Sequence, residues 1–162
     1  MTAPAHVAAS DCERCRPGLV AQPVNAMSSL AFVATGIALV AGADRAVGSS
    51  ADAAVGWAAV AAGLGSVAYH GPGTSAGRYV HDATLVGLLA TVVVADASRI
   101  TGRPAHRGVL AAVPVLALVG AVPRWSMHTQ AVVGVAATVS ESVRIAGMST
   151  GALVVAAVAA AA

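Results

Sequence analysis

The stretch GSVAYHGPGTSAGRYVHDATL, residues 65–85, brings hydroxyl, imidazole and carboxylate side chains close together in a mostly apolar chain. Ser66 and His70 are spaced i to i+4, so both project from one face of a helix at its last turn. Asp82 falls inside the next apolar segment, where an ionisable group is costly unless it faces a polar cavity or a partner. Imidazole is a common zinc ligand, a nearby carboxylate can take a proton from metal-bound water, and a hydroxyl can hydrogen-bond a developing oxyanion. These residue types are the parts of a metal-assisted hydrolase, which makes Ser66, His70 and Asp82 candidate functional residues.

Structural roles compete with this interpretation. A single histidine in a membrane helix is often hydrogen-bonded to backbone, and a serine often bonds its own i−4 carbonyl or another helix. A catalytic zinc normally has three protein ligands, and this stretch supplies only one good ligand, His70. His81 is adjacent to Asp82 and therefore turned about 100° from it on a helix, which predicts an interfacial or supporting position. The residues alone leave both roles open.

The composition is that of a membrane protein. The chain is 57% hydrophobic and 10% charged, whereas a soluble domain carries roughly 25% charged residues. Its mean hydropathy is +0.79, and its small apolar residues suit closely packed membrane helices. The basic residues are all arginine and form no stripe of the kind that nucleic acid requires, so nucleic acid is excluded as a partner. The alanine-rich, lysine-free composition indicates a GC-rich bacterial genome and thus a bacterial cell membrane.

Apolar segments and their breaks predict the helices. A bilayer core needs about 20 apolar residues per helix. Helices are expected at about 24–42, 51–70, 79–98, 108–123, 127–146 and 149–162. The last would extend roughly 21 Å, short of the roughly 30 Å hydrocarbon core. We therefore predict an all-α polytopic transmembrane bundle of five full spans and a partial sixth, forming one domain over 24–162 after a polar tail over 1–23.

The short connections make sequence neighbours antiparallel in the membrane. The first segment then starts, the second ends and the third starts at one membrane face. The polar residues expected to gather there are Asn25, Ser28, Ser29, Ser66, His70, His81 and Asp82.

Charged residues elsewhere give an orientation and two ion pairs. One short loop after the third segment carries Arg99, Arg103 and Arg107. Its positive charge favours the cytoplasmic side for that loop and an external N-terminus. Asp96 with Arg99, and Glu141 with Arg144, are spaced i to i+3, which predicts ion pairs at helix ends.

The polar tail contains one C-x-x-C pair, Cys12 and Cys15. It lacks the second pair or nearby histidine of a zinc site and the strand and helix context of a thioredoxin motif. We interpret it as two cysteines in a short polar arm.

Four motifs in order resemble those of a known family. They are DCE, QPVNAMSSLAF, GSVAYH and HDATL, within residues 11 to 90. In this order the chain resembles the ceramidase-like membrane hydrolases of the CREST superfamily, which includes the alkaline ceramidases and the progestin and adipoQ receptor relatives.

The resemblance implies a seven-helix fold with a zinc ion buried near one face. It implies that His70 is a zinc ligand, that Ser66 orients water or the oxyanion, and that Asp82 is the proton shuttle. Ser28 and His81 would support this site. The implied reaction is hydrolysis of a membrane lipid amide such as ceramide. A calcium site in the tail is also implied, to which Asp11, Glu13 and Asn25 would contribute.

The sequence departs from the family pattern in two places. It has no H-x-x-x-H motif, which in the family supplies two zinc ligands from the seventh helix, and it ends within the expected sixth helix. We therefore expect a fragment or a pseudoenzyme. Gln22 stands where a glutamate is usual, and Asp11 is shifted by one place, which weakens the calcium site.

Two other functions remain open from the sequence. One is a non-enzymatic lipid-binding or receptor-like membrane protein of the same fold. The other is an unrelated helical transporter in which His70 and Asp82 relay protons.

Overall fold

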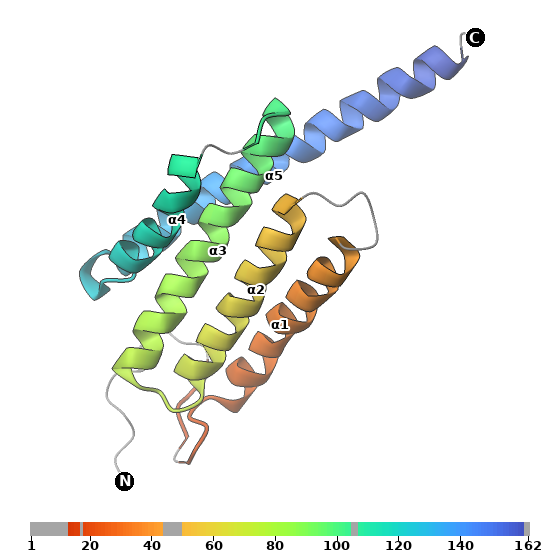
Figure 1. The fold of residues 1–162 in the computed structure, drawn as a ribbon. Coiled ribbons are helices and arrows are strands. Elements are labelled where there is room, and N and C mark those ends of the chain that lie inside the picture. The colour runs from red at the N-terminus through yellow and green to blue at the C-terminus, as the bar shows by residue number, and fades with distance from the viewer. Residues whose placement is uncertain (1–12, 17, 44–49, 105–106, 161–162) are drawn as a thin grey trace.

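The computed structural model describes residues 13–16, 18–43, 50–104 and 107–160, and within them the protein is all-α (Figure 1). Five helices follow one another along the chain: α1 (Pro23–Ala43), α2 (Ser50–His70), α3 (Ser75–Thr101), α4 (Arg107–Gly120) and α5 (Pro123–Ala160). Helix α2 packs between α1 and α3, and α3 also contacts α4 and α5. The chain therefore forms a helical bundle in which α3 is central.

Helices α1, α2 and α3 are each long and apolar enough to cross a membrane. The first two match the predicted segments to within one residue at each end. Helix α3 begins earlier than predicted because Thr74 caps it: the Thr74 Oγ1 accepts a hydrogen bond from the Gly77 N–H at 3.0 Å. Gly102, with φ +64°, ends the helix in the left-handed conformation that glycine adopts without strain. Three membrane-length helices indicate a membrane protein.

The prediction of five full spans and a partial sixth is wrong. Helix α4 has 14 residues and reaches about 21 Å, less than the bilayer core. The two segments predicted at 127–146 and 149–162 form one continuous helix, α5, of 38 residues. A single glycine, Gly147, costs only about 1 kcal/mol in a helix and does not break it. Helix α5 extends beyond the other helices at its C-terminal end (Figure 1).

Small residues bring α1 and α2 into close contact. A Cβ atom on Gly36 would lie 2.5 Å from the carbonyl oxygen of Gly56, and one on Gly63 would lie 2.9 Å from that of Ser29. The absence of these side chains lets the two backbones approach, as is common between membrane helices. This close approach places the start of α1 beside the end of α2.

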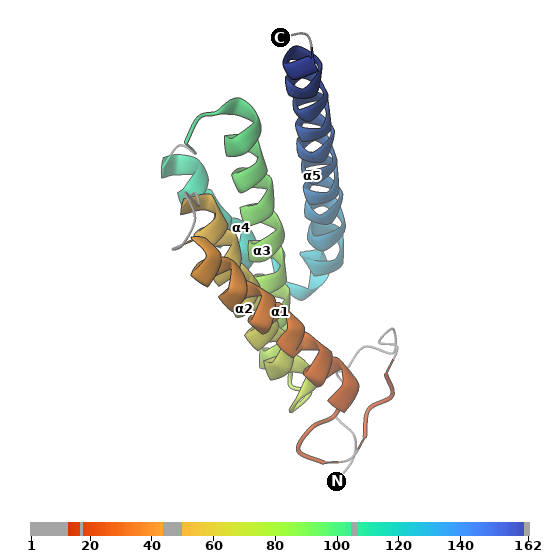
Figure 2. The same cartoon turned by 90° about the vertical axis from the view of Figure 1, so that its right-hand side faces the viewer.

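Helices α3 and α5 run in the same direction and pair with a constant offset in sequence. The Ser126 Oγ donates to Asp82, and the Ser140 Oγ donates to Asp96, with the same sequence separation of 44 in both pairs. The two pairs are two heptads apart, a spacing that keeps one face of a helix against its neighbour. Both helices rise toward the top of Figure 2.

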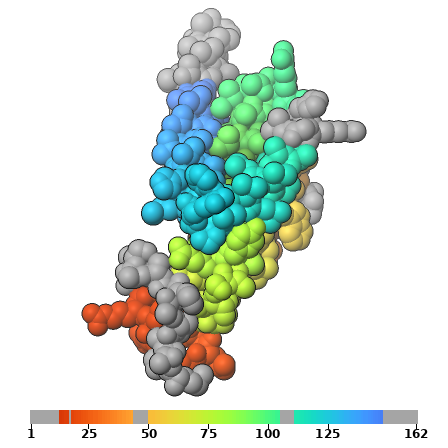
Figure 3. Space-filling model, turned by 90° about the vertical axis from the view of Figure 1, so that its left-hand side faces the viewer, coloured from red at the N-terminus to blue at the C-terminus, as the bar shows by residue number. Residues whose placement is uncertain are grey.

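The outer surface of the bundle is apolar. Large hydrophobic side chains are exposed on every described helix, for example Phe32 on α1, Trp57 on α2 and Leu118 on α4. The space-filling view shows α4 and α5 side by side over one face of α3 (Figure 3). An apolar surface of this extent suits contact with lipid.

Candidate functional site

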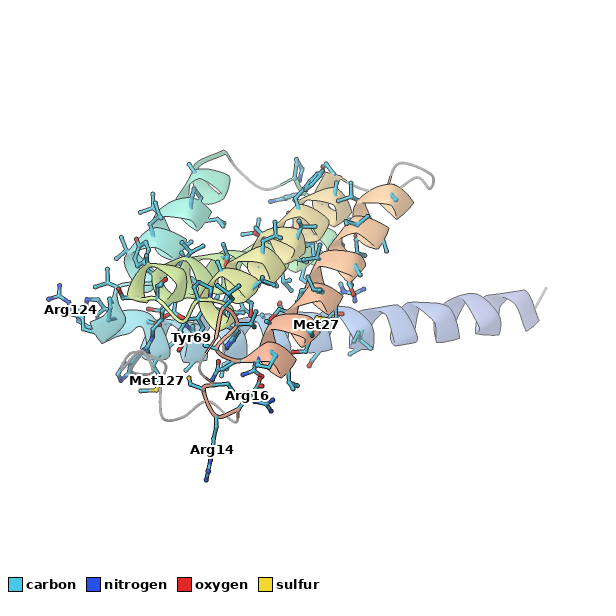
Figure 4. The ribbon with its side chains drawn as sticks, turned by 90° about the horizontal axis from the view of Figure 1, so that it is seen from below. Arg14, Arg16, Met27, Tyr69, Arg124 and Met127 are labelled. Carbon is cyan, nitrogen blue, oxygen red and sulfur yellow. The ribbon has the colours of Figure 1, made fainter. Side chains whose placement is uncertain are left out.

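The polar residues at one end of the bundle form what we name the tail-end cluster: Gln22, Ser29, Ser66, His70, His81 and Asp82. The chain before α1 folds against the turn that joins α2 to α3. There the Ala21 N–H donates to the Gly71 carbonyl oxygen at 2.6 Å, and the Gln22 N–H donates to the His70 carbonyl oxygen at 2.9 Å. Figure 4 views the molecule from this end and shows Arg14 pointing away from the helices. The tail and three helix ends meet here.

Ser66 contacts the first helix through its hydroxyl group. The Ser66 Oγ and the Ser29 Oγ lie 2.7 Å apart, and Ser29 is buried. The Ser29 hydroxyl also donates to the Asn25 carbonyl oxygen at 2.6 Å. Ser28, by contrast, is exposed and bonds only the carbonyl of its own helix at 3.0 Å. The structure thus brings Ser29 rather than Ser28 into the cluster.

The His70 ring lies among aromatic rings and one amide. Its centroid is 4.7 Å from that of Tyr69 and 5.7 Å from that of His81. Its Nδ1 is 2.5 Å from the Oε1 of Gln22. The two histidines, on different helices, are therefore close neighbours.

Asp82 is buried, with 6% of the residue exposed. Its Oδ1 contacts the His81 Nδ1 at 2.9 Å, and its Oδ2 accepts a hydrogen bond from the Ser126 Oγ at 2.5 Å. The Arg78 Nε is more distant, at 3.9 Å. His81, expected at an interface or in support of the site, contacts Asp82 directly although the two are adjacent on the helix. The carboxylate is thus held by hydrogen bonds from α3 and α5.

Glu13 and Asn25, two of the expected calcium ligands, lie together at the start of α1. The two carboxylate oxygens of Glu13 accept hydrogen bonds from the N–H groups of Val24, at 3.2 Å, and Asn25, at 2.8 Å. The carboxylate therefore caps the positive end of the helix. Asp11, the third expected ligand, and Cys12 lie outside the described residues. Calcium binding stays a prediction.

The described residues do not fit a catalytic zinc site. Among them, no group of three or more His, Cys, Asp or Glu side chains could hold a metal ion. A catalytic zinc normally takes three protein ligands. His70 can supply an imidazole, but the described residues do not complete a set of three ligands with it.

A second polar group, which we name the opposite-end network, comprises Asp52, Asp96, Arg99, Ser140, Glu141 and Arg144. Asp96 is completely buried. Its Oδ1 is 3.0 Å from the Arg99 Nη1 and 3.3 Å from the Arg144 Nε. Arg99 also pairs with Asp52, and Arg144 with Glu141. These charges border a cavity of about 380 Å³.

Both predicted ion pairs, Asp96 with Arg99 and Glu141 with Arg144, are confirmed. They are parts of one network between helices rather than separate pairs at helix ends. The sequence contains a signal of this arrangement, because Asp82 to Asp96 and Ser126 to Ser140 have the same spacing. The equal spacing brings these residues together only because α3 and α5 pack in parallel.

Other contacts of the tail-end cluster were not predicted as parts of a site. Gln22 is completely buried and joins the tail to His70. Ser126 reaches Asp82 from α5, and the Gln130 side chain donates to the Ser126 Oγ at 3.0 Å. A serine or glutamine far along the chain gives no local sign of such a role.

Comparison with family models, curated proteins and solved structures finds no match to this chain. The resemblance to ceramidase-like hydrolases therefore rests on the quoted motifs and stays a prediction.

Proposed function

We propose that this chain is an integral membrane hydrolase that cleaves lipid amides such as ceramide. The observation that carries the proposal is that the His70 ring, one turn after Ser66 on α2, lies 5.7 Å from the ring of His81, whose Nδ1 contacts the buried carboxylate of Asp82 at 2.9 Å. If helices α2 and α3 cross the membrane, a hydroxyl, an imidazole and a buried carboxylate would lie near the level where a lipid head group joins its acyl chain.

Asp82 is the group that we assign to proton transfer. Its carboxylate is positioned from two sides, by His81 and by Ser126. A positioned carboxylate can take a proton from an attacking water and pass it to the leaving amine, which contributes about 100-fold or more to the rate. The Ser66 hydroxyl would hydrogen-bond the oxyanion that develops on the amide carbonyl.

Zinc would require ligands in addition to His70, and the described residues supply no complete set. We therefore derive no reaction step through a metal. Measuring the metal content of the purified protein by mass spectrometry tests zinc binding separately. About one zinc per chain, lost in His70→Ala, would support a metal role for His70. Wild-type protein that is fully active without zinc would contradict that role.

The central experiment measures fatty acid release from N-acyl lipids by the purified protein in detergent. We expect Asp82→Asn to lower the rate by about 100-fold or more, and Ser66→Ala to lower it by about 10-fold or more because one oxyanion donor is lost. Thr91→Ala is the matched control on α3, since the Thr91 hydroxyl bonds only the Gly87 carbonyl of its own helix at 2.7 Å.

Unchanged hydrolysis in Asp82→Asn would contradict the assignment of this residue. Binding of N-acyl lipids by the wild-type protein with no release of fatty acid would contradict the enzymatic proposal. That result would favour the lipid-binding or pseudoenzyme alternative.

A proton-coupled transporter is the second candidate, and a specific observation favours it. Helix α3 carries two buried carboxylates, Asp82 and Asp96, each hydrogen-bonded to α5. Intramembrane carboxylates commonly mark ion or proton pathways. A pH-dependent flux into proteoliposomes that disappears in Asp82→Asn, without hydrolysis of any lipid amide, would favour this function.

A further inference from the structure

Gln22 occupies the space between the N-terminal tail and the end of α2. It is completely buried, and its main-chain N–H donates to the His70 carbonyl oxygen at 2.9 Å. Its side-chain Nε2 donates to the Glu13 carbonyl oxygen at 2.7 Å. Its side-chain Oε1 is 2.5 Å from the His70 Nδ1. Gln22 therefore contacts His70 through both its main chain and its side chain.

The contact with Glu13 fixes which way the Gln22 amide points. A main-chain carbonyl oxygen can only accept a hydrogen bond, so the group facing it must be the NH₂ of the glutamine. The amide oxygen must then face His70. The Asn25 side chain agrees with this orientation, because its Nδ2 donates a hydrogen bond to the Gln22 Oε1 at 3.5 Å.

The amide orientation in turn decides the tautomer of His70. An amide oxygen only accepts, so the Nδ1 of His70 must carry a proton to bond with it. In the neutral ring the other nitrogen, Nε2, then has the lone pair. The hydrogen bond made by one ring nitrogen generally sets the state of the other in this way.

We propose that Gln22 is a positioning residue that holds His70 in the Nδ1–H tautomer, with Nε2 as the basic nitrogen of the tail-end cluster. The tautomer assignment rests on the contacts of the Gln22 amide with the Glu13 carbonyl oxygen and with the His70 Nδ1, and not on the proposed function. The use of Nε2 in catalysis rests on the proposed function. The tail takes part because the Glu13 carbonyl orients the Gln22 amide.

Nitrogen NMR tests the tautomer without any substrate. Protein labelled with ¹⁵N-histidine is observed in detergent at a pH where the rings are neutral, and the His70 signals are assigned by their loss in His70→Gln. We expect a protonated Nδ1 and an unprotonated Nε2 for His70. A wild-type His70 protonated on Nε2 would overturn the proposal.

Two variants separate the amide oxygen from the tail contact. Gln22→Met has a similar length but replaces the amide oxygen with a thioether sulfur, which is only a weak acceptor for Nδ1, so we expect His70 to change to a mixture with Nε2–H. Gln22→Glu keeps an acceptor for Nδ1 but loses the donor to Glu13, so we expect Nδ1 to stay protonated. Unchanged helix content, measured by circular dichroism, shows that each variant is folded. If Gln22→Met does not fold, the spectra of the wild-type protein and of Gln22→Glu still show which nitrogen of His70 is protonated.

Hydrolysis measurements test whether the orientation of His70 by Gln22 affects catalysis. If the proposed hydrolase function holds, Gln22→Met lowers kcat by about 10 to 100-fold, as is typical for residues that orient a functional histidine. A changed tautomer with unchanged hydrolysis would overturn the positioning role. An Nδ1–H tautomer in a wild-type protein with no hydrolysis would overturn the proposed function while leaving the tautomer assignment intact.

Discussion

At the scale of single residues, the two buried carboxylates of α3 differ in how their charge is balanced. Asp96 has two guanidinium groups within 3.3 Å, those of Arg99 and Arg144. Asp82 has the His81 imidazole and the Ser126 hydroxyl, with the Arg78 Nε only at 3.9 Å. Asp96 is therefore held by two guanidinium groups, whereas Asp82 is held mainly by an imidazole and a hydroxyl group.

Removing the Asp96 carboxylate is expected to destabilise the protein strongly. In Asp96→Ala two partly buried guanidinium groups lose their shared partner, and breaking a buried pair in this way costs about 3 to 5 kcal/mol. Unfolding in mixed detergent micelles, followed by circular dichroism, measures the loss. Asp52→Ala is the matched control, because the Asp52 side chain is 39% exposed and such a pair contributes about 1 kcal/mol or less. Equal losses in the two variants would contradict the central place of Asp96.

At the scale of the helices, close backbone contact joins α1 to α2 and a fixed register joins α3 to α5. The first depends on the missing side chains of Gly36, Gly56 and Gly63. The second depends on Ser126 and Ser140, which bond α3 at matching positions. Together these contacts fix which polar residues meet at each end of the bundle.

Two alanine substitutions in α1 are expected to act in opposite directions. In Gly36→Ala the new Cβ would lie 2.5 Å from the Gly56 carbonyl oxygen, so the backbones must separate, and overpacking of this kind costs about 1 to 3 kcal/mol. In Gly42→Ala the new Cβ meets no atom within 4 Å, and the helix gains up to about 1 kcal/mol. Unfolding free energies in detergent check both. Equal effects would rule out the close approach.

The serines of α5 give a second test of helix packing. Ser126→Ala and Ser140→Ala each remove a donor to a buried carboxylate, which is expected to cost about 1.5 to 3 kcal/mol of unfolding free energy. Ser142→Ala is the control in the same helix, because the Ser142 hydroxyl is exposed and bonds only the Thr138 carbonyl at 2.7 Å. If all three variants are equally stable in the unfolding assay, the parallel register of α3 and α5 is wrong.

At the scale of the whole molecule, three membrane-length helices separate the two polar groups. The tail-end cluster and the opposite-end network lie two heptads apart along α3, or about 21 Å. This distance is smaller than the roughly 30 Å hydrocarbon core. The two polar groups therefore lie toward opposite ends of the helices that could cross a membrane. If all three helices cross, the tail and the end of α3 lie on opposite sides.

Cysteine labelling tests this topology. In a background in which Cys12 and Cys15 are replaced by serine, single cysteines are introduced as Arg14→Cys in the tail and Arg103→Cys after α3, both exposed positions. With the proposed external N-terminus, a membrane-impermeant thiol reagent labels the first in intact cells and the second only after permeabilisation. Labelling of both from the same side would contradict three crossings, and the reverse pattern would invert the orientation alone.

Much of the tail-end cluster could be predicted from the sequence because it depends on local signals. Apolar length predicted α1 to α3, and the Gly71-Pro72-Gly73 turn predicted that α2 and α3 reverse direction there. That reversal brings His70 beside His81, which in turn contacts Asp82. The number of spans was wrong because hydropathy indicates apolar content but not whether consecutive segments join, as those of α5 do.

The sequence by itself determined the helical class, the approximate extents of α1, α2 and α3, and the turn that brings the end of α2 to the start of α3, because apolar runs and helix-breaking turns act locally. Only the tertiary structure decided that α5 runs parallel to α3, that Asp96 joins two predicted ion pairs into one network, and that Gln22 bonds His70. Each depends on contacts between residues far apart in the chain, where side-chain geometry rather than residue type selects the partner.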